Sequence, residues 1–179
     1  MLIAQDELLH ESVSYDDRLN QWRRSDMGPS WFLRHRYFLC NEPTSFRLAE
    51  GFIVMMRKAG VEAFFDWDSG YYTDEAKSGI ARDLKTRIAA SDVFILIVTE
   101  QAIHSEYCLK ALKFASLINR RIYVVNTSDG KQAYRLPNDA EYHQLTISRS
   151  VGIPPRYLVR VKDQHHEQLW RNVKNSSQL

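Results

Sequence analysis

Side chains that could hold a small ligand follow three apolar runs of the sequence. They are Cys40 and Asn41, then Phe65, Asp66 and Trp67, and finally Ser105, Tyr107 and Cys108. The indole of Trp67 could stack on a flat base, since its face accepts such contacts, or it could pack on the helix that follows. Tyr107 and Cys108 could line the same site or pack against the core. A ligand site and plain helix packing therefore both stay open for these residues.

The motifs of several common enzyme classes are missing from the sequence. The seven glycines are scattered, so there is no GxGxxG or Walker-type phosphate loop, and there is neither a nucleophile elbow nor an HExxH pair. His104 precedes an expected helix, and His165 and His166 lie in a polar segment with no partner ligands nearby. The functions of classical hydrolases, kinases and metalloenzymes are therefore not supported, and no metal site is expected.

Strands alternating with helices must position the candidate side chains. Apolar runs predict strands at 36–40, 61–65, 92–98, 121–125 and 157–161. Helical spacing predicts helices over about 45–59, 73–90 and 104–118, and a closing helix through Leu169 and Trp170. The stretch 126–155 is expected to be irregular. The pattern indicates an α/β fold with three layers, a flavodoxin-like five-stranded parallel sheet of order 2-1-3-4-5 with helices on both faces.

Two parts of the chain are expected, an N-terminal extension over 1–33 and the α/β domain over 34–179. The extension is polar and irregular, and we expect it to pack on the domain with one helix. In a sheet of this order, ligands bind beyond the carboxyl ends of the strands, at the crossover between the first and third strands. This geometry brings Asn41, Asp66, Trp67 and the segment 98–100 to one place.

Composition narrows the partners and the compartment. The 179 residues carry 24 Lys and Arg against 22 Asp and Glu, a net charge of +2 without a basic block. Neither nucleic acid nor a membrane is therefore expected as a partner. The sequence has no signal-peptide pattern and no apolar run of about 20 residues, so a cytoplasmic location is expected. Cys40 and Cys108 form neither a disulfide framework nor a CxxC metal motif.

Three segments in one order carry a family resemblance. They are VEAFFDWDSG at 61–70, the run from IARDLK through SDVFILIV to SEYCLKAL at 80–112, and RRIYVV at 120–125. Together they resemble the TIR (Toll/interleukin-1 receptor) family, especially bacterial members of antiviral defence systems such as Thoeris, over about residues 36–126. Three positions depart from the family pattern. The first strand exits as Cys-Asn-Glu-Pro instead of Ser-Tyr-Ser, Tyr107 replaces Trp, and Ala111 stands where the enzymatic members keep a glutamate.

The resemblance implies an activity on NAD, as an NAD nucleosidase or an ADP-ribose cyclase that makes a nucleotide signal in immunity. NAD would be the substrate, with no further cofactor. Cleavage leaves an oxocarbenium-like ribose that one carboxylate can stabilise. Residues 107, 108 and 111 share one helix face, whereas Glu106 lies about 140° away from residue 111 and cannot replace the missing carboxylate. Losing that contact typically costs about 3–4 kcal/mol, so the chain should be close to inert.

Two explanations of Ala111 are open. The leading one is a Glu-to-Ala change that disables an NAD-cleaving enzyme, and the alternative is a natural non-catalytic scaffold or adaptor acting by homotypic assembly. A nucleoside deoxyribosyltransferase-like enzyme is a third possibility, although it also needs a carboxylate. The expected partners are NAD, another copy of the chain, and a sensor or effector protein. The NAD hypothesis requires that residue 111 face a cleft beside the Trp67 loop, and burial in the apolar interior would argue against it.

Overall fold

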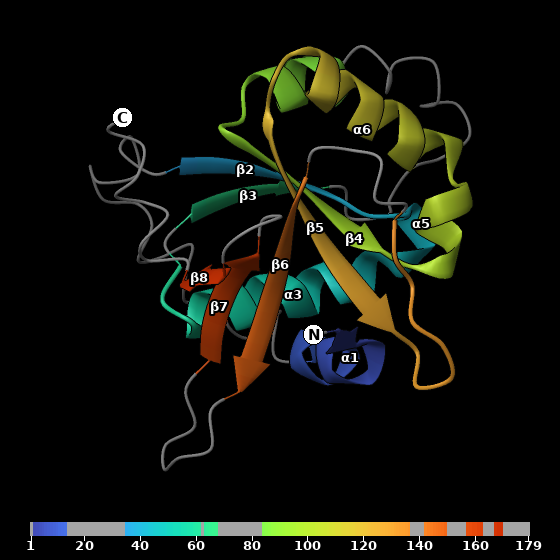
Figure 1. Cartoon of the computed structure of the whole chain (residues 1–179), viewed down its shortest axis with the longest axis vertical. Helices are drawn as coiled ribbons and strands as arrows, with labels where there is room; N and C mark the ends of the chain where they lie inside the picture. The colour runs from blue at the N-terminus through green and yellow to red at the C-terminus, as the bar shows by residue number, and fades with distance from the viewer. Residues whose placement is uncertain are drawn as a thin grey trace.

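A mostly parallel β-sheet organises the computed structural model, which describes residues 2–13, 35–61, 63–67, 84–136, 142–149, 157–162 and 167–169 (Figure 1). Its strands are β1 (Ile3–Ala4), β2 (His35–Cys40), β3 (Ala63–Trp67), β4 (Val93–Val98), β5 (Arg121–Ser128), β6 (His143–Arg149), β7 (Tyr157–Lys162) and β8 (Glu167–Leu169). The fold is therefore mixed α/β, as the sequence predicts.

The strand order is β3-β2-β4-β5-β6-β7-β8, with β1 paired to β5 off this path. Strands β3, β2, β4, β5 and β6 are parallel, so the first four predicted strands stand in the predicted 2-1-3-4 arrangement. The fifth place was predicted wrongly. It belongs to β6, inside the stretch expected to be irregular, and the strand at 157–162 runs antiparallel beside it.

The prediction of a closing helix was also wrong for residues 167–169. Residues Glu167–Leu169 form β8, which pairs antiparallel with β7. Trp170 lies outside the described residues. The order past the fourth strand therefore departs from the flavodoxin-like five-strand pattern, because a β6–β7–β8 meander replaces a strand and a helix.

Helices cover both faces of the sheet. They are α1 (Gln5–Ser12), the short 3-10 helix η2 (Pro43–Ser45), α3 (Phe46–Lys58), the helical residues 84–89, α5 (Glu100–His104) and α6 (Glu106–Leu117). In Figure 1, α6 lies above the sheet while α3 and α1 lie below it. None of the helices within the described ranges is long and apolar enough to cross a membrane.

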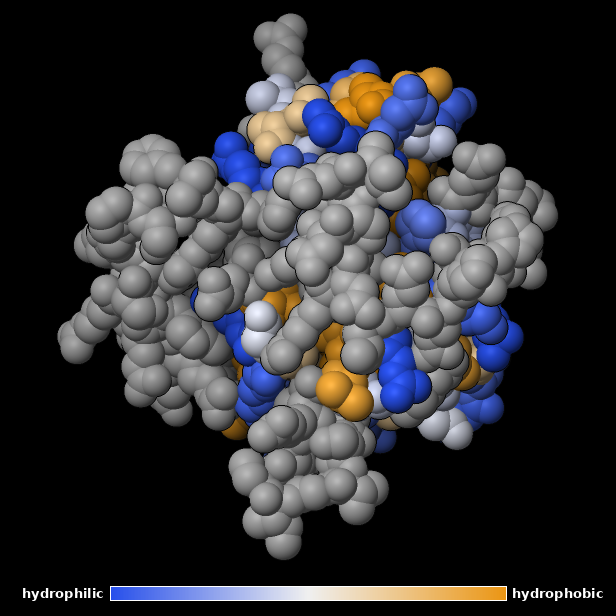
Figure 2. All heavy atoms as spheres, turned by 60° about the vertical axis from the view of Figure 1, so that its left-hand side comes forward, coloured by the Kyte–Doolittle hydropathy of each residue, from blue (hydrophilic) through white to orange (hydrophobic). Residues whose placement is uncertain are grey.

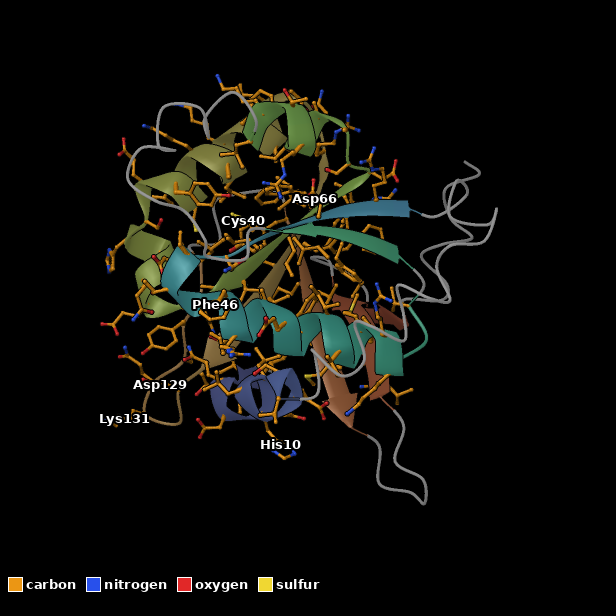
Figure 3. The ribbon with its side chains drawn as sticks, turned by 180° about the vertical axis from the view of Figure 1, so that it is seen from behind. His10, Cys40, Phe46, Asp66, Asp129 and Lys131 are labelled. Carbon is orange, nitrogen blue, oxygen red and sulfur yellow. The ribbon has the colours of Figure 1, made fainter. Side chains whose placement is uncertain are left out.

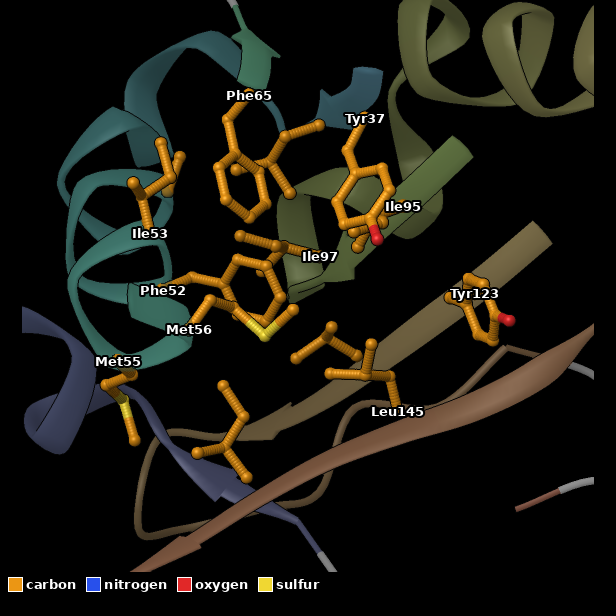
Figure 4. Packing of buried hydrophobic residues seen from close by; sticks show 14 of the residues in the cluster. Tyr37, Phe52, Ile53, Met55, Met56, Phe65, Ile95, Ile97, Tyr123 and Leu145 are labelled. Carbon is orange, nitrogen blue, oxygen red and sulfur yellow. The ribbon is translucent and has the colours of Figure 1, made fainter. Parts of the chain in front are cut away.

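The strands divide their side chains between two apolar layers, because successive residues of a strand point to opposite faces. On the α3 side, Phe65 packs edge-on against Tyr37 and Phe52, with ring centroids 5.5 and 6.4 Å apart (Figure 4). On the α6 side, Phe38 and Cys40 join the inner residues of α6. Burying one such Phe side chain contributes roughly 1.5–3 kcal/mol to the free energy of folding, so both layers stabilise β2 and β3 at the edge of the sheet.

The first residues of the chain are built into the domain. The fully buried Leu8 packs α1 against α3, where a Cβ on Gly51 would lie 1.8 Å from the Leu8 carbonyl oxygen. Glu11 forms an ion pair with Lys58. The described part of the expected N-terminal extension contains one helix, α1, and it packs on the domain. The expected boundary at 33/34 falls within 14–34, outside the described residues, and stays a prediction.

Candidate functional site at the carboxyl edge of the sheet

The crossover expected from the strand order lies between β2 and β4. Strand β2 pairs with β3 on one side and β4 on the other, all parallel, so their carboxyl ends meet at one edge. Cys40 is the last residue of β2 and lies in register with Leu96 of β4, while Asp66 of β3 lies in register with Phe38. The predicted residues of β2 and β3 are therefore neighbours in the structure.

The two cysteines lie together between the end of β2 and the first turn of α6. Cys40 and Cys108 are both fully buried in the apolar cluster beneath α6, and their thiols are hydrogen-bonded to each other. Ser105 caps the helix, its Oγ accepting a hydrogen bond of 3.4 Å from the Cys108 amide. The hydrogen bond from Cys40, and a weaker one from Ser105, lower the pKa of Cys108 against the opposing effects of burial and the Glu42 charge. Three predicted residues are thus brought together.

Asn41 carries an unsatisfied amide oxygen at this edge. The residue is 1% exposed, and its Nδ2 donates a 2.9 Å hydrogen bond to the backbone oxygen of Glu42. Its Oδ1 is buried and has no hydrogen-bond partner among the described residues. Buried polar atoms are nearly always paired in folded proteins, so this oxygen stands out among the polar atoms of the described residues.

Asp66 is held in an ion pair that the sequence does not reveal. The Nε of Arg87, in helical residues 84–89, lies 3.0 and 3.1 Å from the two carboxylate oxygens of Asp66, and its second guanidinium nitrogen also contacts Oδ1. The guanidinium also lies over the Phe38 ring, 5.3 Å from its centroid. This geometry is bidentate and charge-assisted, so Arg87 neutralises the carboxylate that was expected to bind substrate.

Of the two aromatic residues predicted at the site from the end of β3, Phe65 lies away from it. Phe65 points into the α3-side layer, on the opposite face of the sheet from Asp66, and it serves the core instead of the edge. The backbone of Trp67 ends β3 in register with Leu39. The Trp67 side chain and the loop after it lie outside the described residues, so the stacking hypothesis stays a prediction.

The inner face of α6 is apolar. Ala111 has no exposed surface and lies with Cys108 and Ala115 in the cluster against the sheet. Tyr107 is half-buried against the same cluster. Among the described residues, the side chain of residue 111 therefore has apolar neighbours, which is the arrangement that the NAD hypothesis names as counting against it.

Glu106, the acidic residue of α6, points to solvent. It pairs with Lys110 at 2.7 Å one turn further along, and this hydrogen bond and charge lower the pKa of Glu106. Its side chain is 82% exposed, so it does not reach the inner face where Ala111 lies. The helix geometry inferred from the sequence, which separates Glu106 from residue 111, agrees with this placement.

Two residues of the edge were missed by sequence reasoning. Arg87 lies 21 positions from Asp66, and no spacing rule connects them. Glu42 stands directly after Asn41, and its carboxylate caps η2 by accepting a 2.8 Å hydrogen bond from the Thr44 amide. Its position just before Pro43 is a capping signal that could have been read from the sequence. Among the described residues, no cluster of His, Cys, Asp and Glu could hold a metal ion.

Comparison with models of known protein families gives no match, and comparison with curated proteins gives none either.

Proposed function

We propose that the chain is a TIR-type domain that works as a non-catalytic assembly module, associating with further copies of itself. The observation that supports this most is the complete burial of Ala111 in the apolar cluster between α6 and the sheet. NAD cleavage needs a carboxylate beside the ribose, and residue 111 is where the TIR resemblance would put one.

The neighbouring carboxylates within the described part of the chain do not supply the missing group. Glu106 points outward and pairs with Lys110, and Asp66 is engaged by the guanidinium of Arg87. Glu42 is the remaining acidic residue that affects Cys108, and it caps η2. Each of these carboxylates is committed to a protein partner, which favours a structural role for the edge over glycosidic chemistry.

The outer face of α6 offers a surface for self-association. Leu109 and Leu117 are 45% and 71% exposed, two helical turns apart, with the exposed Lys110 and Lys113 between them. Figure 2 shows apolar side chains beside strongly hydrophilic ones at the upper end of the molecule, where α6 lies. Apolar side chains within a charged surround are typical of protein interfaces.

The experiment is sedimentation velocity over a wide range of concentrations, with the wild type and with Leu109→Ser/Leu117→Ser. The wild type is expected to self-associate and the double variant to stay monomeric. Val13→Ser is the matched control, because Val13 is 79% exposed directly after α1, a helix that lies across the sheet from α6, and should leave association unchanged. A wild type that stays monomeric at every concentration would overturn the proposal, and association that survives the double variant would overturn the role of α6.

A disabled NAD-cleaving enzyme is the second candidate, and one observation favours it. The buried Oδ1 of Asn41, which has no partner within the described ranges, lies at the crossover between β2 and β4, where parallel α/β sheets bind ligands. This candidate predicts that the wild type binds NAD without releasing nicotinamide, with an affinity that falls in Asn41→Leu. Calorimetric titration with NAD separates the two candidates, because the assembly module should give no binding heat.

A further inference from the structure

We propose that Cys40 and Cys108 are a site of reversible oxidation, at which a peroxide converts the two thiols into a disulfide that ties the end of β2 to the first turn of α6. The inference does not depend on the function of the domain, because it rests on the contact between the two cysteines. It also differs from the sequence expectation, which gave these residues a binding role and no mutual contact.

The two thiols are already neighbours in the folded chain. Cys40 closes β2 and Cys108 is the third residue of α6, yet both belong to one buried cluster and their thiols share a hydrogen bond. Figure 3 labels Cys40 and Asp66 on the side of the sheet that α6 covers. No rearrangement of strand order is needed to join the two residues. Both cysteines are reduced in this structure.

The surroundings of Cys108 favour its thiolate, which is the form that reacts with oxidants. The residue lies in the first turn of a 12-residue helix, where the helix dipole stabilises negative charge. Hydrogen bonds from Cys40 and Ser105 act in the same direction and lower the pKa of Cys108, while burial and the charge of Glu42 act against it. We therefore assign Cys108 as the attacking thiol and Cys40 as the resolving one.

The reaction balances with hydrogen peroxide as the oxidant. The Cys108 thiolate attacks one peroxide oxygen, the O–O bond breaks, and hydroxide leaves while Cys108 becomes a sulfenic acid. The Cys40 sulfur then attacks the sulfenic sulfur, the S–O bond breaks, and a second hydroxide leaves. The thiol protons convert both hydroxides to water. Two thiols lose two electrons, and one peroxide becomes two waters.

The burial of the two thiols should slow their oxidation, and the disulfide that forms should stabilise the fold. Because neither thiol is exposed, oxidation requires the first turn of α6 to open, so we expect it to be slower than that of an exposed thiol. The disulfide would close a ring from residue 40 to 108 that contains η2, α3, β3, β4 and α5. A ring of this size restricts the unfolded chain, and we expect Tm to rise by roughly 5–10 °C.

The test treats the full, folded chain with hydrogen peroxide after removal of reductant, followed by peptide mapping without reduction. The expected result is a single linked peptide pair containing Cys40 and Cys108 within one chain, reversed by dithiothreitol and accompanied by the rise in Tm. Because this mapping uses the wild type, it does not depend on whether any variant folds.

Two variants assign the roles of the thiols. Cys40→Ser should accumulate sulfenic acid on Cys108, trapped by dimedone, whereas Cys108→Ser should leave Cys40 reduced under the same treatment. The proposal is overturned if both thiols of the folded wild type stay free, or if links form only between chains. Sedimentation of the same samples measures self-association independently of the disulfide. The assembly proposal can therefore fail while the disulfide still forms.

Discussion

Residue 111 determines what the inner face of α6 can do. An alanine there completes a buried layer with Cys108 and Ala115, and this layer packs against β4 and β5. A carboxylate at the same place would lie in a low-polarity environment, where an unpaired charge is costly. At the scale of single residues, the described part of this helix face is therefore explained by apolar packing.

The ion pair between Arg87 and Asp66 is expected to matter for stability. Both side chains are mostly buried, at 19% and 24% exposed, so removing the guanidinium leaves a carboxylate poorly solvated. We expect Arg87→Met to lower the free energy of unfolding by about 1–3 kcal/mol, measured by urea denaturation. Lys110→Met is the control, because it breaks the exposed pair with Glu106 and should cost at most about 0.5 kcal/mol. Equal effects of the two variants would contradict this interpretation.

Asp129 makes the turn after β5 sensitive to acid. Its carboxylate accepts 2.9 Å hydrogen bonds from the amides of Gln132 and Lys131 and a 2.7 Å bond from the Tyr134 hydroxyl. Chiefly the Gln132 amide, with these partners, lowers the pKa of Asp129 to about 2. The pKa of Asp129 in the folded chain lies below the unfolded value of about 3.9. The ionised carboxylate therefore contributes its full stabilisation of the fold above that value, and this stabilisation is lost as the pH falls towards 2.

Urea unfolding of the wild type and Asp129→Asn measures this contribution. The wild type should be the more stable of the two at pH 6, and the difference should shrink as the pH is lowered from about 4 to 2. A difference that stays constant through that range would show that ionisation of Asp129 is not what stabilises the turn.

At the scale of elements, the apolar runs of the central strands were sufficient to predict the first half of the sheet. Strand β4 is buried at all six positions, so its sequence indicates a central parallel strand. Strand β6 was missed because it has only two buried apolar residues, Leu145 and Ile147, separated by a polar one. Its partner β7 was predicted as a strand, but its antiparallel place depends on pairing with β6.

The candidate site was predictable to a similar extent. Chain order and the parallel rule brought Cys40, Asn41 and Asp66 to one edge, because those rules act on whole elements. The contacts between Asp66 and Arg87 and between Cys40 and Cys108 depend on side-chain directions and on distant parts of the chain. Spacing along the sequence carries no information about such contacts.

The close contact between α1 and α3 gives a prediction at this scale. Replacing glycine by alanine inside a helix normally stabilises by about 0.5–1 kcal/mol. Gly51→Ala should do the opposite and lower Tm, because the added methyl would lie 1.8 Å from the Leu8 carbonyl oxygen and push α1 away. Thermal unfolding followed by circular dichroism measures the change. An increase in Tm would show that α1 does not occupy this position in solution.

At the scale of the whole molecule, the sheet separates two layers with different roles. The layer below, with α1, α3 and the β6–β7 pair, buries most of the large side chains and anchors the N-terminal segment. The layer above, with α5 and α6, covers the carboxyl edge on its inner side and presents Leu109 and Leu117 on its outer side. The two leucines are therefore available for the self-association that we propose, while the inner residues of α6 serve the core.

The most direct test of the central claim places a glutamate at the position that the account assigns to the interior. Ala111→Glu should lower the free energy of unfolding by several kcal/mol, because the carboxylate enters an apolar layer. Ser116→Glu, on the exposed face of the same helix, should change it little. Neither variant should release nicotinamide from NAD. An Ala111→Glu protein that unfolds like the wild type and releases nicotinamide would contradict the account, because residue 111 would then face a working nucleotide site.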